Sequence, residues 1–446
     1  MINVEKYSRF RRLIFGFIIM LTLFISNQSA ATNYWNGTTY TIEIPNGGVN
    51  GFLQKAQYSI FVPKGVEFIK GILIHQHGCT MEGTGEPIVT DAQYQAFAKK
   101  WSLVILAPDL YPKDGKDCYD WRNPEDGSGP SLLAALNRFS ELTGHLELNK
   151  APWLLWGHSG GGYWVLNMTK TFPERIIATF AYSPAFDPDF NYPEAVNKIP
   201  VMIRHAGAAD FNDPGGDCWA TALHTFSKLR ARNGLISVAY NAHQNHNLSY
   251  VRLMALPFFE SVLAQRLSKK RTSFLRDMDA SKAWLCDTIT SGEIRIYKAS
   301  KYQGDILSKS WLPDSVCASK FREYLKTGTV KDITPPPAPM NLKLKIVDEK
   351  SSILTWEADA DIESGIKYFN VYIEEKLLGR YPEKDDFQTF DTNGDNPHPA
   401  IPAEMRYQIN RLNLNPGSKI ALSTVNREGL ESAKSTIVIN KNQIQP

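Results

Sequence analysis

Apolar and polar residues alternate in two stretches between about 38 and 63, TYTIEI and YSIFV, and this period of two predicts strands with one buried face. From about residue 70 the pattern changes to short apolar runs separated by amphipathic stretches. The runs predict six buried strands, at 71–77, 102–109, 151–159, 176–185, 199–207 and 235–241. The amphipathic stretches predict helices near 91–101, 130–143, 163–172, 218–233 and 248–267. Buried strands alternating with helices predict an α/β fold, a mostly parallel sheet flanked by helices, in one domain over 36–270.

The rest of the chain follows two other patterns. Residues 271–333 are polar and partly helical, so they form either a linker or a small subdomain. The proline-rich run Thr334–Pro339 favours an extended chain. Short alternating strands follow, at 351–358, 367–375, 405–412, 419–425 and 435–440. They predict an all-β antiparallel sandwich over 334–446.

The N-terminus has the layout of a signal peptide. Four basic residues precede the apolar run 13–25, and the small residues Ser29, Ala30 and Ala31 follow it. A membrane-spanning helix needs about 20 apolar residues, which this run does not reach. We therefore expect a signal peptide over 1–31, cleaved after Ala30 or Ala31. The protein would be secreted or periplasmic, with no membrane contact beyond that peptide.

Composition and charge narrow the function classes. Hydrophobic residues make up 43% of the chain and charged residues 21%, which is typical of globular domains. The net charge of +3 arises in the signal-peptide region, so the remainder is neutral and lacks the basic stripe of a nucleic-acid binder. The five cysteines form no C-x-x-C pair. In an exported protein some should pair, and Cys286 with Cys317 or Cys118 with Cys218 are two candidates.

One motif carries the chemistry. Residues 157–161, GHSGG, fit the pattern G-x-S-x-G between a predicted buried strand and a predicted helix. A serine on a sharp strand-to-helix turn has a strained backbone and needs small neighbours, and the helix N-terminus favours developing negative charge. Ser159 is therefore the candidate nucleophile. The alternative is a glycine-rich turn that only packs the helix against the sheet.

This motif in this context resembles the α/β-hydrolase family, and the resemblance covers residues 36–270. It implies a catalytic serine, acid and histidine in that order along the chain. The serine is Ser159, and the acid is Asp210, which follows the strand at 199–207 in a G-x-x-D pattern. Other acids nearby fit less well. They are Asp213 and Asp217 in the same loop, and Asp187 and Asp189 after the preceding strand.

The resemblance also implies a histidine after the last strand of the sheet. Two histidines follow the strand at 235–241, and His246 is preferred over His243 because the segment from His246 onward resembles the family's final loop and helix. His246 would take the proton of Ser159 during attack on an acyl carbon. Asp210 would orient the imidazole and stabilise the imidazolium.

An oxyanion needs two backbone N–H donors. One would be the amide of Gly160, directly after the nucleophile. The other would come from the loop His77-Gly78-Cys79-Thr80, which resembles the oxyanion loop of polyhydroxybutyrate depolymerases and feruloyl esterases. We place this second donor at Cys79. Two alternatives are a simple strand-ending turn and a nucleophilic Cys79, but no residue is identified as a base for that thiol.

Metal catalysis is a competing interpretation. His75 with His77 and His243 with His246 form H-x-H and H-x-x-H pairs, and side chains two apart on a strand point the same way. A serine hydrolase already gives one member of each pair a place, so we predict no metal and no cofactor.

The C-terminal region resembles fibronectin type III domains. The resemblance rests on the proline-rich entry, Trp356, the turn Leu414–Gly417 and the segment Val425–Gly429. Ile420 departs from it, because the family usually has a tyrosine there. The resemblance implies a spacer or a carbohydrate-surface adaptor.

The sequence thus predicts a secreted serine hydrolase with an acyl-serine intermediate, most simply a carboxylic-ester hydrolase. Polysaccharide-linked and polymeric esters are the candidate substrates, and no nucleic-acid partner is expected. A serine peptidase of the same fold and an inactive adhesion or binding protein are the alternatives. Oligomeric state stays open.

Overall fold

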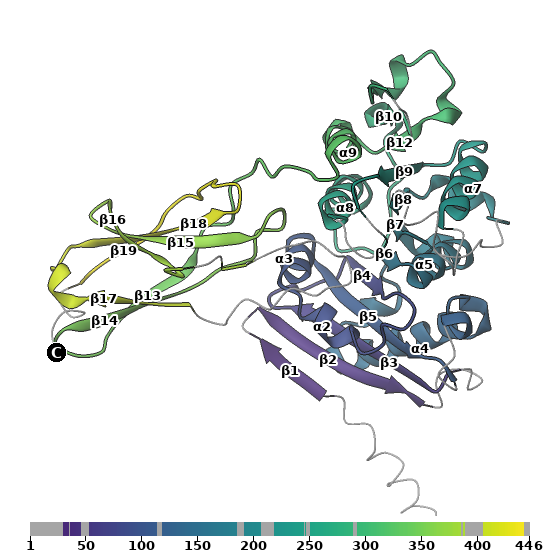
Figure 1. The fold of residues 1–446 in the computed structure, drawn as a ribbon. Coiled ribbons are helices and arrows are strands. Elements are labelled where there is room, and N and C mark those ends of the chain that lie inside the picture. The colour runs from purple at the N-terminus through teal and green to yellow at the C-terminus, as the bar shows by residue number, and fades with distance from the viewer. Residues whose placement is uncertain are drawn as a thin grey trace, which may run out of the picture.

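The computed structural model describes residues 30–34, 36–45, 53–113, 118–184, 191–206, 218–244, 246, 250–288, 292–384, 387–388 and 405–440. Figure 1 shows a large domain built around one sheet, a small region beside α9, and an elongated pair of sheets that ends the chain. No helix among these residues is long and apolar enough to cross a membrane.

The central sheet has nine strands in the order β1-β2-β3-β5-β4-β6-β7-β8-β9. The pairs β1–β2, β2–β3 and β3–β5 are antiparallel. The pairs β5–β4, β4–β6, β6–β7, β7–β8 and β8–β9 are parallel. The strands are β1 (Ala30–Tyr34), β2 (Gly37–Ile44), β3 (Lys55–Pro63), β4 (Gly71–Gln76), β5 (Leu103–Tyr111), β6 (Trp153–His158), β7 (Ile176–Tyr182), β8 (Val201–Ala206) and β9 (Ile236–Asn241). The six predicted buried strands are confirmed as β4 to β9.

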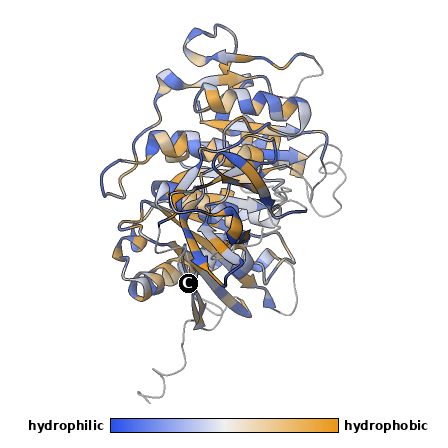
Figure 2. Ribbon diagram, turned by 90° about the vertical axis from the view of Figure 1, so that its left-hand side faces the viewer, coloured by the Kyte–Doolittle hydropathy of each residue, from blue (hydrophilic) through white to orange (hydrophobic). Residues whose placement is uncertain are grey.

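Helices cover both faces of this sheet. One hydrophobic core joins the sheet to α4 (Ser128–Thr143), α5 (Gly160–Thr171) and α7 (Cys218–Arg230). A second core on the other face joins it to α2 (Gly85–Val89), α3 (Ala92–Trp101) and α8 (Arg252–Arg266). Hydrophobic and hydrophilic segments alternate along the helices in Figure 2, as expected of helices with one buried face. A mostly parallel sheet between two helical layers, with a serine turn after a central strand, is the α/β-hydrolase fold.

Residues 284–327 add a compact unit to the second core. The strands β10 (Trp284–Cys286), β11 (Ile296–Lys298) and β12 (Ser310–Leu312) form a small sheet, and α9 (Ser315–Thr327) follows. Helix α9 buries Phe321 and Tyr324 completely within the second core. The Val238 amide on β9 donates a 3.1 Å hydrogen bond to Ser310 Oγ. These contacts join β12 and α9 to the sheet domain.

The C-terminal residues form the predicted antiparallel sandwich. One sheet contains β13 (Met340–Ile346), β14 (Ser351–Glu357) and β17 (Met405–Asn410). The other contains β16 (Lys376–Tyr381), β15 (Ile366–Ile373), β18 (Lys419–Asn426) and β19 (Ser435–Val438). Trp356 is fully buried between them, 5.4 Å from the Phe369 ring. Ile420 is also fully buried, so its side chain fills core space.

The cysteine pairing corrects both candidate pairs. The disulfide joins Cys79 to Cys118, across 39 residues. Cys218, Cys286 and Cys317 are buried and lie outside this disulfide. Burial raises the pKa of Cys286 to about 12, so this thiol stays protonated. The pairing could not be predicted because it depends on how two loops meet above the sheet.

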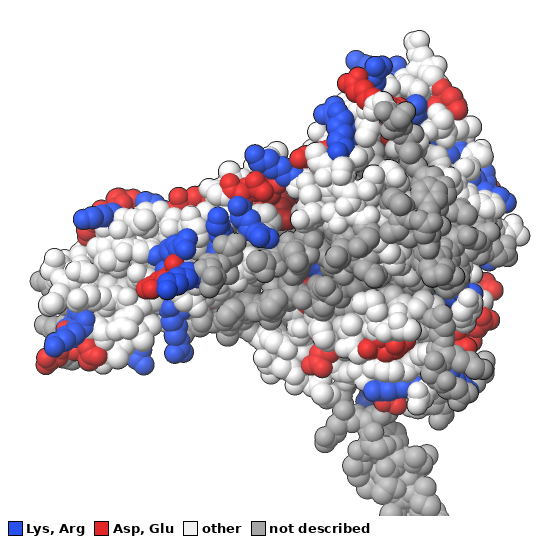
Figure 3. All heavy atoms as spheres, viewed as in Figure 1, with Lys and Arg blue, Asp and Glu red and all other residues white. Residues whose placement is uncertain are grey.

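The charged side chains of the described residues form no large area of one sign on the face that Figure 3 shows. On the face shown in Figure 3, basic and acidic side chains of the described residues are interspersed over both the sheet domain and the sandwich. This agrees with the neutral composition beyond residue 31.

Candidate active site

Ser159 lies between β6 and α5, where the chain turns sharply from strand to helix. Its backbone has φ 51° and ψ −116°, a conformation that L-residues rarely adopt and that costs about 1–3 kcal/mol. Its amide donates a 2.8 Å hydrogen bond to the Tyr182 carbonyl. A Cβ atom on Gly161 would overlap the carbonyls of Gln76 and His77. The motif glycine at 161 is therefore required by close backbone approach.

The oxyanion-loop residues lie next to the start of α5. A Cβ atom on Gly160 would overlap Cys79 Sγ and would lie 2.7 Å from Cys118 Sγ. The disulfide therefore rests directly on Gly160, and Cys79 and Gly160 are adjacent. Because the first amides of a helix have no partner within that helix, the N-terminus of α5 offers donors at this place. Cys79 is oxidised in the disulfide, so a nucleophilic Cys79 thiolate is ruled out in this structure.

Asp109, near the carboxyl end of β5, holds the loop that follows β4. Its carboxylate is almost fully buried and accepts hydrogen bonds from the amides of Gly83 (2.8 Å) and Gly85 (3.0 Å). His77 Nε2 lies 3.8 Å from Asp109 Oδ1, and His77 Nδ1 donates to the Gly78 carbonyl at 2.6 Å. These groups fix the segment 77–85, which includes Cys79.

His246 lies over the strand that carries the nucleophile. Its backbone carbonyl accepts hydrogen bonds from the Tyr182 hydroxyl (2.6 Å) and from His158 Nε2 (3.2 Å). Its ring lies 5.0 Å from the ring of His158, the residue before Ser159. His243 is exposed and donates through Nε2 to the Lys326 carbonyl on α9 at 3.3 Å. The structure thus places His246 beside His158, next to the Ser159 turn, and places His243 against α9.

The candidate acid lies outside the described residues. Asp210, Asp213 and Asp217 follow β8 in the sequence, and Asp187 and Asp189 follow β7. The carboxyl ends of β7 and β8 lie at the same edge of the sheet as the Ser159 turn.

The histidine pairs do not gather as metal ligands. The His75 ring stacks on the Trp156 ring with 5.6 Å between ring centres, whereas the His77 ring meets the Trp121 ring edge-on with 5.5 Å between centres. Because Trp156 and Trp121 belong to different cores, the expectation that these two histidines point the same way is wrong. Strand β4 ends at Gln76, so the alternation of side chains stops before His77.

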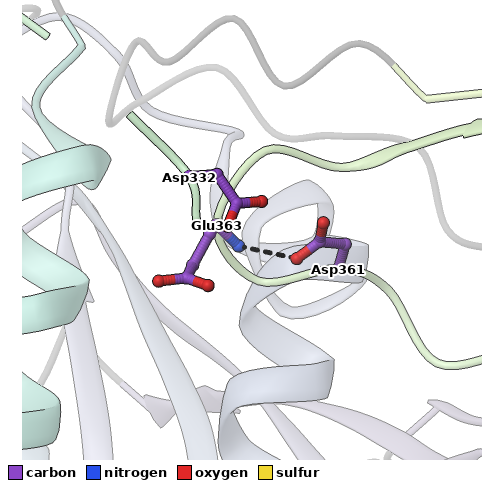
Figure 4. Close-up of side chains that lie close together, drawn as sticks. All are labelled: Asp332, Asp361 and Glu363. Carbon is purple, nitrogen blue, oxygen red and sulfur yellow. Dashed lines mark hydrogen bonds between the residues drawn. The ribbon is translucent and has the colours of Figure 1, made fainter. Parts of the chain in front are cut away.

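Among the described residues, one group of acidic side chains lies close enough together to hold a metal ion, at the junction with the sandwich. Figure 4 shows Asp332, Asp361 and Glu363 together there, with the Glu363 amide donating to Asp361. Ser364 Oγ donates to Asp332 at 2.7 Å, and Lys320 Nζ donates to Glu363 at 2.6 Å. These hydrogen bonds connect α9 to the segment that enters the sandwich. The chemistry at Ser159 does not require this cluster.

Sequence reasoning missed two positioning residues. Tyr182 ends the apolar strand β7, and Asp109 lies near the end of β5, after an apolar run. A polar residue near the carboxyl end of a buried strand is a signal that could have found both, because such positions open onto the site edge of this fold.

Comparison with known proteins gives a fold likeness only. No family model matches the chain, and neither does any curated protein. An S-formylglutathione hydrolase from Agrobacterium tumefaciens is 14% identical over 53% of this chain and 96% of its own, with a TM-score of 0.38. Methylesterase BT1017 is 15% identical over 67% and 69%, with a TM-score of 0.37. A ferulic acid esterase is 12% identical over 48% and 92%, with a TM-score of 0.33. Such distant likenesses carry no argument about activity.

Proposed function

We propose that this protein is a serine hydrolase that cleaves carboxylic esters, with Ser159 as nucleophile, His246 as general base and Asp210 as the residue that orients the imidazole. The observation that carries the proposal is the strained Ser159 turn at the start of α5. Two features support it: Cys79 and Gly160 are adjacent, and the His246 carbonyl is anchored beside His158. Strain of this kind persists only where the surrounding structure enforces it.

The reaction follows from these positions. His246 takes the hydroxyl proton as Ser159 Oγ attacks the acyl carbon, and the amides of Gly160 and Cys79 receive the resulting oxyanion. Collapse breaks the bond to the alkoxy group, which leaves with the proton from His246. Water then attacks the acyl-serine with His246 as base, releasing the carboxylic acid and restoring Ser159.

Location and accessory parts belong to the same proposal. A signal peptide over 1–31 would deliver the protein to the periplasm or the exterior, and the Cys79–Cys118 disulfide supports an oxidising compartment. We assign residues 36–270 to the hydrolase domain and 271–333 to a subdomain that packs on α8. Residues 334–446 form a fibronectin-like module, which would act as a spacer or as an adaptor to a carbohydrate surface.

The test measures turnover of p-nitrophenyl esters of increasing acyl length by the purified mature protein, with Ser159→Ala as the paired variant. A panel of peptide p-nitroanilides runs beside it. Ester turnover that disappears in Ser159→Ala supports the proposal. Turnover of the anilides alone would instead indicate a peptidase, and a folded protein without any turnover would indicate a binding protein.

A further inference from the structure

The sandwich meets the sheet domain through residues 358–364, the segment between β14 and β15, which we define as the docking loop. The Ile362 carbonyl in this loop accepts a 2.6 Å hydrogen bond from Gln93 Nε2 on α3. The Ile362 side chain packs against the second core of the sheet domain and against the core of the sandwich. Ala92 and Ala96 of α3 are buried against the sandwich core. Because each domain buries apolar side chains of the other, the sandwich is docked on the sheet domain.

Two ion pairs flank the Ile362 contact. Lys99 Nζ on α3 lies 2.9 Å from both carboxylate oxygens of Asp359. Lys320 Nζ on α9 lies 2.6 Å from Glu363 Oε1. All four side chains are partly exposed, so each pair contributes little energy by itself. We expect the pairs to set the orientation of the sandwich, with the apolar contact as the main source of its stability.

Gln93 connects the docking loop to the start of α8. While its Nε2 donates to the docking loop, its Oε1 accepts a 2.9 Å hydrogen bond from Arg252 Nη1. The same nitrogen of Arg252 donates to Asp91 Oδ2 at 2.9 Å, and Asp91 caps α3 by accepting from the amides of Gln93 and Tyr94. Asp91, Gln93 and Arg252 are each at most 1% exposed. A buried polar group that loses its partner is costly, so these three side chains hold one another in a fixed arrangement.

Helix α8 places Arg252 at the edge of the sheet that carries the candidate site. Arg252 is the first residue of α8, and Arg266, the last, donates a 2.7 Å hydrogen bond to the Ile177 carbonyl near the start of β7. The helix packs on β7, and its 15 residues span about 22 Å, close to the length of that strand. The start of α8 therefore lies toward the carboxyl end of β7, where Tyr182 holds the His246 carbonyl.

We propose that the docked sandwich positions the base of the reaction, because it holds the start of α8 through Gln93 and Arg252. This inference rests on the proposed function of His246, which lies six residues before Arg252. Tyr182 fixes one end of that segment and Arg252 fixes the other. Undocking frees the Gln93 side chain, so Arg252 loses a fixed acceptor and α8 loses its anchor at this end. The sandwich thereby has a role in catalysis in addition to that of a spacer or an adaptor.

The test releases the sandwich within the full chain. The undocked variant combines Ile362→Asp, which places a charge in the apolar contact, with Lys99→Glu and Lys320→Glu, which make both ion pairs repulsive. Small-angle X-ray scattering measures the release as an increase in the radius of gyration. A scattering profile equal to that of wild type would show that these contacts do not hold the sandwich and would overturn the proposal.

A matched control carries the same change of charge at exposed positions of the sandwich outside the docking loop. It combines Leu377→Asp, Lys343→Glu and Lys345→Glu. This control should keep the scattering profile, kcat and KM of wild type. The melting temperature is measured for every variant, so that unfolding is recognised.

Kinetics on a neutral p-nitrophenyl ester test the positioning role. In the undocked variant kcat should fall about tenfold with KM nearly unchanged, because the base loses orientation rather than substrate contact, and the pH profile of kcat should shift. Gln93→Met keeps the size of the side chain but loses both hydrogen bonds. It should lower kcat to a similar extent while the sandwich stays docked through Ile362 and the ion pairs. A normal kcat in either folded variant would overturn the proposal.

Hydrogen exchange separates this inference from the proposed function. Amides in the first turns of α8 should exchange about tenfold faster in the undocked variant and in Gln93→Met than in wild type and the control. Amides at the other end of α8, which Arg266 fastens to β7, are the internal reference and should not change. If wild type hydrolyses no ester, the proposed activity fails, and this exchange difference still decides whether the sandwich holds α8. Equal exchange in all four proteins would overturn the inference.

Discussion

The hydroxyl of Tyr182 donates a 2.6 Å hydrogen bond to the backbone carbonyl of His246. Tyr182 is the last residue of β7, and its own carbonyl accepts the amide of Ser159. One residue therefore contacts both the nucleophile turn and the loop of the proposed base, so its backbone and side chain set the spacing of the two.

Removing that hydroxyl tests its positioning role. Tyr182→Phe keeps the ring stacked on His158 but loses the bond to His246. We expect kcat for a neutral p-nitrophenyl ester to fall about tenfold, with KM nearly unchanged, because the base loses orientation rather than substrate contact. Steady-state kinetics measure this, and the pH profile of kcat should shift as well. An unchanged kcat would show that the His158 contact alone holds the loop.

Substitutions of His246 and His243 should have very different effects on kcat. His246→Ala should lower kcat by at least about 10³-fold, as expected for loss of a triad base. His243→Ala should stay within about threefold of wild type, because His243 contacts the Lys326 carbonyl on α9. Kinetics on the same ester decide the assignment. The reverse pattern would transfer the role of base to His243.

Asp109 should control the oxyanion loop without touching substrate. Asp109→Asn replaces one carboxylate oxygen by an amide group that cannot accept the hydrogen bond from Gly83 or Gly85. We expect kcat to fall by about 10²-fold, comparable to the loss of one oxyanion donor. The melting temperature should be measured alongside, so that unfolding is excluded. A folded variant with normal kcat would mean that the disulfide alone holds Cys79 in place.

The junction cluster predicts a pH dependence of stability. Burial, followed by the charge of Asp332, raises the pKa of Asp361 to about 7, so the folded protein holds a proton that the unfolded chain releases near pH 4. The contribution of Asp361 to stability is therefore complete below about pH 4 and is lost as the pH rises through 7. The free energy of unfolding of Asp361→Asn should exceed that of wild type by about 2 kcal/mol at pH 8 and match it near pH 4.

Denaturant unfolding at the two pH values measures this difference. The neighbouring groups that titrate or carry charge at the junction are Asp332, Glu363 and Lys320, and they are unchanged in the variant. A stability difference that does not depend on pH would contradict the assignment of the proton to Asp361.

Local patterns predicted the scaffold of the candidate site well. The run WLLWGH followed by glycines identified β6 and the Ser159 turn, because burial of a strand and the geometry of a sharp turn each leave a signature within a few residues. Helix α5 begins at Gly160, three residues earlier than the predicted start at 163, because the motif glycines themselves form its first turn.

Contacts between distant segments could not be predicted in the same way. The partners Tyr182 and His246 are 64 residues apart, and Cys79 and Cys118 are 39 apart. These contacts depend on the strand order β5-β4-β6-β7 in the sheet. The sequence of a single segment does not determine that order. The edge strand β13 was missed although its sequence carries the signal: Met340, Leu342, Leu344 and Ile346 alternate with exposed polar residues.

The central claim is that Ser159 is an activated nucleophile. The measurement is covalent labelling of the purified mature protein by a fluorophosphonate probe, with peptide mass spectrometry to locate the adduct and Ser159→Ala as control. We expect one adduct per chain, on Ser159, that is absent from Ser159→Ala and forms much more slowly in His246→Ala. A folded wild-type protein that takes up no label, or takes it up equally well in Ser159→Ala, would contradict it.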